Sequence, residues 1–304
     1  MRLIRLLVLL LCFATINVSG QDEPSAAESE NTEAPLVEIA ALPKHVGEAS
    51  GLAMSKSGLL WTHNDGGLPM LFCFDTLGNL VKSQQLNHPN SGWESLAADK
   101  SGTLYLGAFG NNKNDKRELK IYIIRDPEGI KERVFTAEII RYRYADQKEY
   151  PAADTDKNFD MDAFIAMDDA LYLFSKNRTK PFTGYTKVYK LPKIAGTYEA
   201  ELVDSIYLGK GPMLDSWVTG ADISPDGKRV VLLSHQYIWS IADFTPEKFS
   251  SGSIQKFHLD HFSHKAGVTF SSNKQLYIVD EREFNLIGGK LYRMDLNRVP
   301  QKLQ

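Results

Sequence analysis

The stretch Gly51-Leu52-Ala53-Met54-Ser55-Lys56-Ser57-Gly58-Leu59-Leu60-Trp61 decides the fold of this 304-residue chain. It joins two short apolar segments through a Ser-Gly pair, and glycine tolerates the positive backbone angle that a tight hairpin turn requires. The same unit of strand, turn and strand recurs four more times along the chain. The further copies lie at 96–105, 164–172, 221–232 and 268–277.

A third strand with alternating apolar and polar residues follows each unit, and a fourth strand follows most of them. The fourth strands are expected at 81–86, 138–144, 201–207 and 253–259. The fifth unit has no fourth strand of its own, because the chain ends at Gln304. We expect the segment Leu36–Leu42, which precedes the first unit, to complete the last sheet and close a ring.

Radial repetition of four-stranded units, at intervals of roughly 44 to 68 residues, is typical of a β-propeller. The sequence therefore predicts an all-β propeller with five detected blades, and a sixth, diverged blade stays open as an alternative. A β-sandwich would explain the alternation of apolar and polar residues but not the recurring position of the turns.

The first 35 residues differ in composition from the rest. Residues 1–20 combine a basic start, an apolar run too short to span a bilayer and small residues before Gln21, which predicts a signal peptide. Lipid attachment at Cys12 is the less favoured alternative. Residues 21–35 are acidic and poor in apolar side chains, and we expect a disordered linker there. The predicted propeller domain covers 36–304 of a secreted or periplasmic protein without a transmembrane segment in its mature chain.

The composition excludes some classes of function. The chain has 35 basic and 38 acidic residues with no basic stripe, which argues against a nucleic-acid partner. Cys73 is the one cysteine after the signal peptide, so no internal disulfide is expected, and its alternating strand predicts a buried thiol. The chain contains no Gly-x-Ser-x-Gly nucleophile motif.

One face of the propeller is expected to gather polar side chains. The first strand of each blade lines the axis, so the residues at its start converge. Alignment of the units on their turns places five residues at that position: Ser50, Glu94, Asp162, Thr219 and Ala266. The loops that follow the second strands add further polar groups to the same face.

These groups suggest three kinds of role. Carboxylate and amide oxygens from several blades suit Ca²⁺, which takes six to eight hard oxygen ligands. Imidazole titrates near neutral pH and suits acid-base catalysis. The predicted metal ligands are Glu48, Glu94, Asn111 and Asp162, the predicted catalytic residues are His63, Asp65 and His235, and the predicted ligand-binding residues are Asn64, Asn112, Arg117, Lys176, Arg178 and Asp222. The alternative for the carboxylates and amides is a structural role in holding turns and neighbouring blades.

Three segments carry a resemblance to known proteins: Trp61–Gly67, Trp93-Glu94, and Gly107–Asn112 followed by Arg117. With them the chain, over about residues 36–297, resembles a family of exported bacterial propeller proteins, which implies the fold and export more firmly than an activity. It is more distantly similar to the gluconolactonase, paraoxonase and strictosidine-synthase-like group. That resemblance implies a central Ca²⁺ that polarises an ester, lactone or phosphotriester, held by Glu48 or Glu94 with Asn64, Asn111 and Asp162. The fifth unit departs from it with Ala266-Gly267.

Two main functions follow as hypotheses. The first is an exported propeller that binds a polar small molecule, glycan or protein loop at its central face, with Ca²⁺ as a possible cofactor. The second is a Ca²⁺-dependent hydrolase of lactones or esters. A scaffold that uses its outer blade edges for protein contacts is a weaker third hypothesis.

Overall fold

The computed structural model describes residues 32–284 and 286–297. The described residues all belong to one compact unit of the chain. The predicted signal peptide and most of the predicted linker lie outside the described residues.

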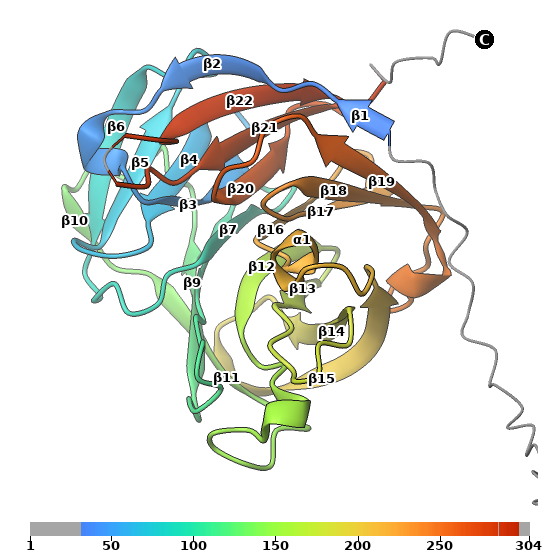
Figure 1. Ribbon diagram of the computed structural model, residues 1–304. Coiled ribbons are helices and arrows are strands. Elements are labelled where there is room, and N and C mark those ends of the chain that lie inside the picture. The colour runs from blue at the N-terminus through green and yellow to red at the C-terminus, as the bar shows by residue number, and fades with distance from the viewer. Residues whose placement is uncertain (1–31, 285, 298–304) are drawn as a thin grey trace, which may run out of the picture. The chain divides into compact units, whose positions relative to one another are not determined.

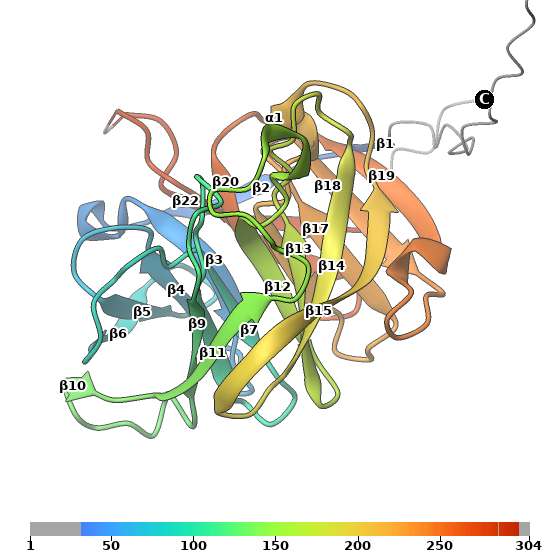
Figure 2. The same cartoon turned by 90° about the horizontal axis from the view of Figure 1, so that it is seen from below.

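This unit is a five-bladed β-propeller, with four antiparallel strands in each blade (Figures 1 and 2). The first strand of each blade lies next to the axis and packs against the first strand of the next blade. The first blade contains β3 (Ala49–Met54), β4 (Leu60–Asn64), β5 (Met70–Phe74) and β6 (Leu80–Leu86). The second contains β7 (Ser95–Ala98), β8 (Leu104–Ala108), β9 (Leu119–Ile124) and β11 (Glu138–Tyr144). The third contains β12 (Met161–Met167), β13 (Ala170–Ser175), β14 (Tyr185–Pro192) and β15 (Gly196–Tyr207). The fourth blade contains β16 (Gly220–Ile223), β17 (Arg229–Leu233), β18 (Tyr237–Ala242) and β19 (Ser253–Leu259). The fifth contains β20 (Lys265–Phe270), β21 (Gln275–Asp280), β22 (Lys290–Asp295) and β2 (Val37–Ala41).

The propeller prediction is confirmed, and the described residues form five blades without a sixth. Helical segments are short and lie in the connections. They are α1 (Met213–Ser216) and the single 3₁₀ turns η1 (Lys44–Val46), η2 (Asp154–Asp156) and η3 (Phe249–Ser251). Within the described part of the chain, no helix has the length and apolar character needed to cross a lipid bilayer.

The ring is closed by the N-terminal strand, as the sequence predicts. β2 pairs antiparallel with β22, with Val37 opposite Arg293 and Ala41 opposite Lys290. The first strand of the fifth blade, β20, also packs against β3 of the first. Gly267 makes this approach possible, because a Cβ there would lie 2.7 Å from the carbonyl carbon of Gly51 in β3.

Three short pairings join neighbouring parts of the ring. β11 pairs in parallel with the start of β15, from Ile140 opposite Gly196 to Tyr144 opposite Ala200, and so merges the second and third blades into one eight-stranded sheet. The two-residue strand β10 (Val134–Phe135) pairs with the end of β6. The three-residue strand β1 (Thr32–Ala34) pairs with β19.

Strand β1 corrects the predicted linker, which extends to residue 35. Residues 32–34 belong to the fourth blade's sheet instead of a disordered segment. The reason is local burial: Ala34 is 2% exposed and packs in a core cluster with Phe257 and Leu259. The backbone N–H of Leu36 also donates to the Asp260 carboxylate, at 3.3 Å.

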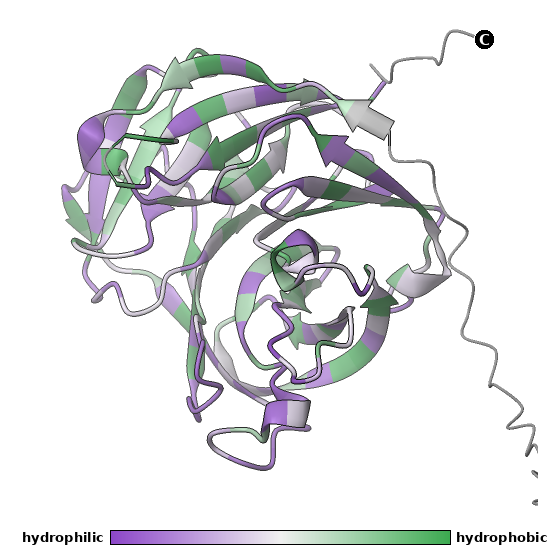
Figure 3. Cartoon of the chain, in the orientation of Figure 1, coloured by the Kyte–Doolittle hydropathy of each residue, from purple (hydrophilic) through white to green (hydrophobic). Residues whose placement is uncertain are grey.

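The apolar core lies between the blades, because side chains alternate along each strand (Figure 3). Its largest fully buried members include Trp61 and Trp93. Cys73 is 1% exposed, which confirms the prediction of a buried thiol, and burial raises its pKa to about 12. The stability of the propeller comes from this burial in the absence of a disulfide among the described residues.

Candidate functional site

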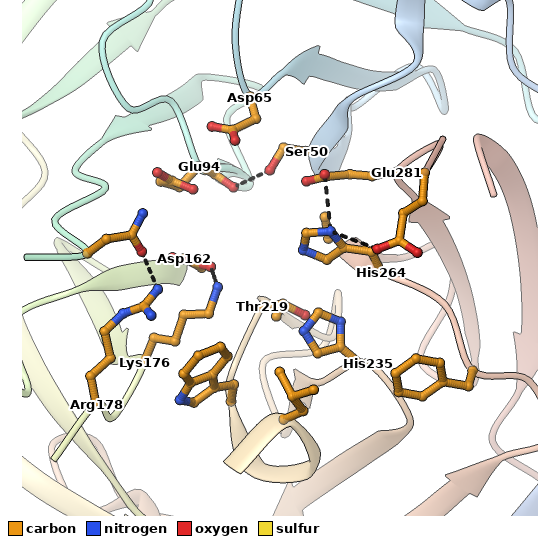
Figure 4. A pocket seen from close by; sticks show the side chains of 16 residues that line it. Ser50, Asp65, Glu94, Asp162, Lys176, Arg178, Thr219, His235, His264 and Glu281 are labelled. Carbon is orange, nitrogen blue, oxygen red and sulfur yellow. Dashed lines mark hydrogen bonds and ion pairs between the residues drawn. The ribbon is translucent and has the colours of Figure 1, made fainter. Parts of the chain in front are cut away.

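A cavity of about 380 Å³ opens at the face where the first strands begin (Figure 4). All five residues that the alignment of the units places at these strand starts line it: Ser50, Glu94, Asp162, Thr219 and Ala266. The loops that follow the second strand of each blade supply a second layer: Asp65, Asn112, Lys176, Arg178, His235, Glu281 and Glu283. The five blades therefore converge at this face, as the sequence analysis expects. The roles predicted for the individual residues stay predictions.

Both cations of the cavity are held by internal partners. The Lys176 ammonium pairs with the carboxylate of Asp162, and both residues are under 10% exposed. Burial by itself lowers the pKa of Lys176, but the charges of Asp162 and Asp160 outweigh it and the pKa is raised. The Arg178 guanidinium donates to the fully buried Asp160 carboxylate at 2.6 Å and to the Asn112 side chain.

An aromatic wall stands beside these cations. The Arg178 guanidinium carbon lies 4.6 Å from the ring centroid of Trp217, and the Lys176 nitrogen lies 5.2 Å from it. The Trp217 indole nitrogen donates to the carbonyl of Asn177 at 2.6 Å, which fixes the ring. Phe262 and Leu214 add apolar surface to the same lining.

Two carboxylates of the cavity have no partner. Asp65 lies one residue after β4 and Glu94 one residue before β7, and neither side chain makes a hydrogen bond or an ion pair within residues 32–284 and 286–297. Burial raises the pKa of Glu94 well above its usual range, and the charges of Asp162 and Asp65 raise it further. Asp65 is exposed at the cavity, but partial removal of its carboxylate from water, then the charges of Asp162 and Glu48, also raise its pKa. The ionised carboxylates of the cavity therefore repel one another, and no cation of the described residues forms an ion pair with Asp65 or Glu94.

Histidines and a glutamate form the opposite side of the cavity. His264 Nδ1 lies 3.2 Å from a Glu281 carboxylate oxygen, and the His264 ring centroid lies 4.8 Å from that of His235. Burial, with the positive charge that His264 would carry, lowers the pKa of His235 to about 4, so its imidazole is neutral at pH 7. Lys265, a fully buried lysine, donates to the His235 carbonyl at 3.1 Å and holds this loop in place.

Glu281 makes stability depend on pH. Burial, followed by the charge of Asp65, raises its pKa from 4.5 to about 8, so the folded state keeps a proton that the unfolded chain releases near pH 4.5. Its contribution to stability is complete below pH 4.5 and is lost as pH rises to about 8. We expect Glu281 to lower the free energy of unfolding by about 2 kcal/mol between pH 6.5 and pH 8.5, at ~1.4 kcal/mol per pH unit, and Glu281→Gln to lack this part of the pH dependence.

Urea denaturation at the two pH values measures this effect. Glu201→Gln, an exposed carboxylate on the outer strand β15, is the matched control and should keep the wild-type decline. An equal decline in the wild type and in Glu281→Gln would show that Glu281 is ionised in the folded protein at pH 6.5.

Three predicted site residues near β4 do not line the cavity. His63 is fully buried inside its blade, with Nδ1 2.9 Å from the Asn64 carbonyl and its ring edge-on to Trp93. Burial lowers its pKa to about 4. The Asn64 amide donates to the His45 carbonyl at 2.9 Å and accepts from the Glu48 N–H, while the exposed Glu48 carboxylate accepts from the Gly66 N–H at 3.2 Å. These contacts support the structural alternative, in which the side chains hold turns.

Three other predicted residues also lie away from the cavity. Asn111 is 2% exposed, and its side chain donates to the Phe159 carbonyl and accepts from two backbone N–H groups of its own loop. The Arg117 guanidinium lies 4.4 Å from the Tyr150 ring centroid. Asp222 lines a different cavity, formed by the hairpin turns, and its carboxylate accepts from Phe270 N–H and Thr269 Oγ1. Burial raises its pKa to about 6.

The residues present do not fit the predicted calcium shell. Of the four predicted ligands, Glu94 and Asp162 line the cavity, and Asp162 is already paired with Lys176. Among the residues that the structure describes, no three His, Cys, Asp or Glu side chains lie close enough together to hold a metal ion. Calcium stays a prediction that no observation of the described residues supports.

The predicted site omits several residues of the cavity. Glu281 and His264 lie close to repeat positions and could be found by extending the alignment by one or two residues. Trp217 and Phe262 lie in connections between blades, outside the repeated unit, and the sequence pattern contains no signal for them.

Comparisons with known proteins show no family for this chain. No protein-family model and no curated protein matches the chain. Among solved structures, the chain is similar to a streptogramin B lyase, with 12% identity, a TM-score of 0.47, and coverage of 86% of this chain and 97% of that one. A virginiamycin B lyase from Staphylococcus aureus has 17% identity and a TM-score of 0.40, over 82% and 68% of the two chains. A PQQ-bound aldose sugar dehydrogenase from Streptomyces coelicolor has 11% identity and a TM-score of 0.47, over 87% and 98%. Likenesses at this level carry no information about activity.

Proposed function

We propose that this protein is an exported β-propeller that binds a polar small molecule, or the end of a glycan or protein loop, in its central cavity. One observation carries the proposal: all five blades direct side chains into a single cavity of about 380 Å³ that combines charged groups with the aromatic wall of Trp217. That volume lies in the usual range of ligand sites, roughly 300 to 1,000 Å³, in which a few polar groups orient a ligand against apolar surface. Export rests on the composition of residues 1–20.

Thermal melting with a panel of neutral and charged monosaccharides, sugar acids and amino acids tests this proposal. A ligand that binds the folded state stabilises it by about 2.7 kcal/mol at 100 times its Kd, so at least one class should raise the melting temperature by several degrees. Thr219→Phe puts a ring into the cavity and should abolish the rise. Thr197→Phe, on an exposed part of β15, is the matched control and should keep it. A rise that survives Thr219→Phe would place binding elsewhere and contradict the proposal.

A hydrolase of lactones or esters is the second candidate. His264 beside Glu281, with the neutral His235 close by, supports it, because an imidazole oriented by a carboxyl group suits proton transfer. The same sample, assayed on a panel of lactones and aryl esters with calcium chloride or with a chelator, separates the two functions. Turnover that the chelator removes would favour the calcium-dependent hydrolase, whereas binding without turnover would favour the first proposal.

A further inference from the structure

The charged groups of the cavity leave two carboxylates without an ionic partner among the described residues. Lys176 is paired with Asp162, Arg178 with Asp160, and His264 lies against Glu281. The carboxylates of Asp65 and Glu94 remain, and Figure 4 shows both on the same side of the cavity, with Ser50 beside them. Because Lys176, Arg178 and His264 already have partners within the cavity, a ligand group that neutralises these two carboxylates must itself carry a positive charge.

His235 independently indicates a ligand. It lines the cavity, is 7% exposed, and neither nitrogen of its ring makes a hydrogen bond with any residue of the described part of the chain. A neutral imidazole offers one donor and one acceptor. Both ring nitrogens of His235 are reached from the cavity, so a bound polar molecule can accept from one of them and donate to the other. The ligand should therefore extend from Asp65 and Glu94 across the cavity to His235.

The small number of free acceptors favours an organic cation over a metal ion. Ca²⁺ requires six to eight oxygens at about 2.3–2.6 Å, and no three His, Cys, Asp or Glu side chains of the described residues lie close enough to hold a metal. A primary ammonium has three N–H donors and forms charge-assisted hydrogen bonds at about 2.7–2.9 Å, so two carboxylates and one neutral oxygen satisfy it. Trp217 and Phe262 would then cover the carbon skeleton.

We propose that Asp65 and Glu94 bind the ammonium group of a small organic amine whose remaining polar groups face His235 and whose skeleton packs against Trp217. This inference rests on the proposed function and narrows its ligand to an amine. A neutral or anionic molecule of the same shape binds more weakly, because it leaves both carboxylates unpaired.

Isothermal titration calorimetry with glucosamine, glucose and glucuronate tests the inference, since the three share one ring and differ in charge. At pH 6.5 and low salt, where the amine is protonated, we expect glucosamine to bind about tenfold or more tightly than glucose, and glucuronate to bind most weakly. The double variant Asp65→Asn/Glu94→Gln should bind glucosamine and glucose equally. Each single variant should lose part of the preference, and Glu201→Gln should keep all of it.

The outcomes separate this inference from the proposal on which it rests. Both substitutions keep the size of the side chain and remove like charges, and a melting curve of each variant checks that it is folded. Equal binding of the three sugars, or a preference for glucosamine that survives the double variant, would overturn the amine inference and leave the proposed function standing. If none of the three sugars binds but a compound of the panel without an amino group does so in a Thr219-dependent manner, the amine inference again fails alone. Binding of an amino acid supports the inference if the double variant abolishes it and overturns the inference if the double variant keeps it. Failure of the whole panel overturns both.

Discussion

Lys176→Met is expected to lower the free energy of unfolding by about 3–5 kcal/mol, which is the usual cost of removing one partner of a buried ion pair. Lys176 and Asp162 are 7% and 8% exposed, and their pairing neutralises a charge that no other cation of the described residues contacts. Methionine fills a similar volume, so the loss reports the charge and not a cavity. Without the ammonium, Asp162 would remain buried beside Glu94 and Asp65. Urea denaturation at pH 7 measures the change.

Two variants make this result specific. Lys176→Met/Asp162→Asn replaces the whole pair by neutral groups and should recover most of the loss, because no charge is left buried without a partner. Arg125→Met breaks the Arg125–Glu138 pair, which has an N···O distance of 2.6 Å and is about half exposed, and should cost less than about 1 kcal/mol. A loss below 1 kcal/mol for Lys176→Met would mean that the pair does not exist in solution.

Removal of the ring-closing strand is expected to have the second large effect. A chain shortened to begin at Pro43 loses β2, so that β22 loses its neighbour along Lys290–Arg293 and Leu42, 3% exposed in the full chain, no longer covers the core. The net stability of a domain is about 5–15 kcal/mol, and the loss of a complete outer strand is of that order. We expect this chain to show no cooperative melting transition in calorimetry.

A chain that begins at Leu36 is the control for this deletion. It keeps β2 and loses only β1, whose three residues pair with the edge of the fourth blade. It should melt cooperatively, a few degrees below the longer chain. If the chain that begins at Pro43 melted in the same way, the ring would not depend on β2 for its closure.

The sequence predicts the blades well because each blade repeats one local pattern. The fourth strands expected at 138–144 and 253–259 have those bounds in the structure. The strand expected to start at residue 201 begins at Gly196, because residues 196–200 pair with β11 of the neighbouring blade. A pattern confined to one blade contains no signal for a pairing between blades.

The position of the site is predictable from the sequence, whereas the roles of its residues are not. Glu94 and Asp162 reach the cavity because every first strand begins there. Asn64 and Asn111 lie next to the same strands, but their short amide side chains bind backbone groups of the adjacent turns instead of facing the cavity. Whether such a side chain contacts a turn or a ligand depends on the direction in which it points, and residue type and spacing do not determine that direction.

The pairing of β11 with β15, which joins two blades into one eight-stranded sheet, helps to fix the positions of the charged groups in the cavity. Five main-chain pairings tie the second blade, which carries Glu94, to the third, which carries the paired Asp162 and Lys176. The boundary between the third and fourth blades has no such tie among the described strands. Side-chain contacts join that boundary instead, because the Asp204 carboxylate of β15 accepts from the backbone N–H and the hydroxyl of Ser250 in the fourth blade. The separation of Lys176 from His235 therefore depends on side-chain packing, whereas that of Glu94 from Asp162 depends on main-chain hydrogen bonds.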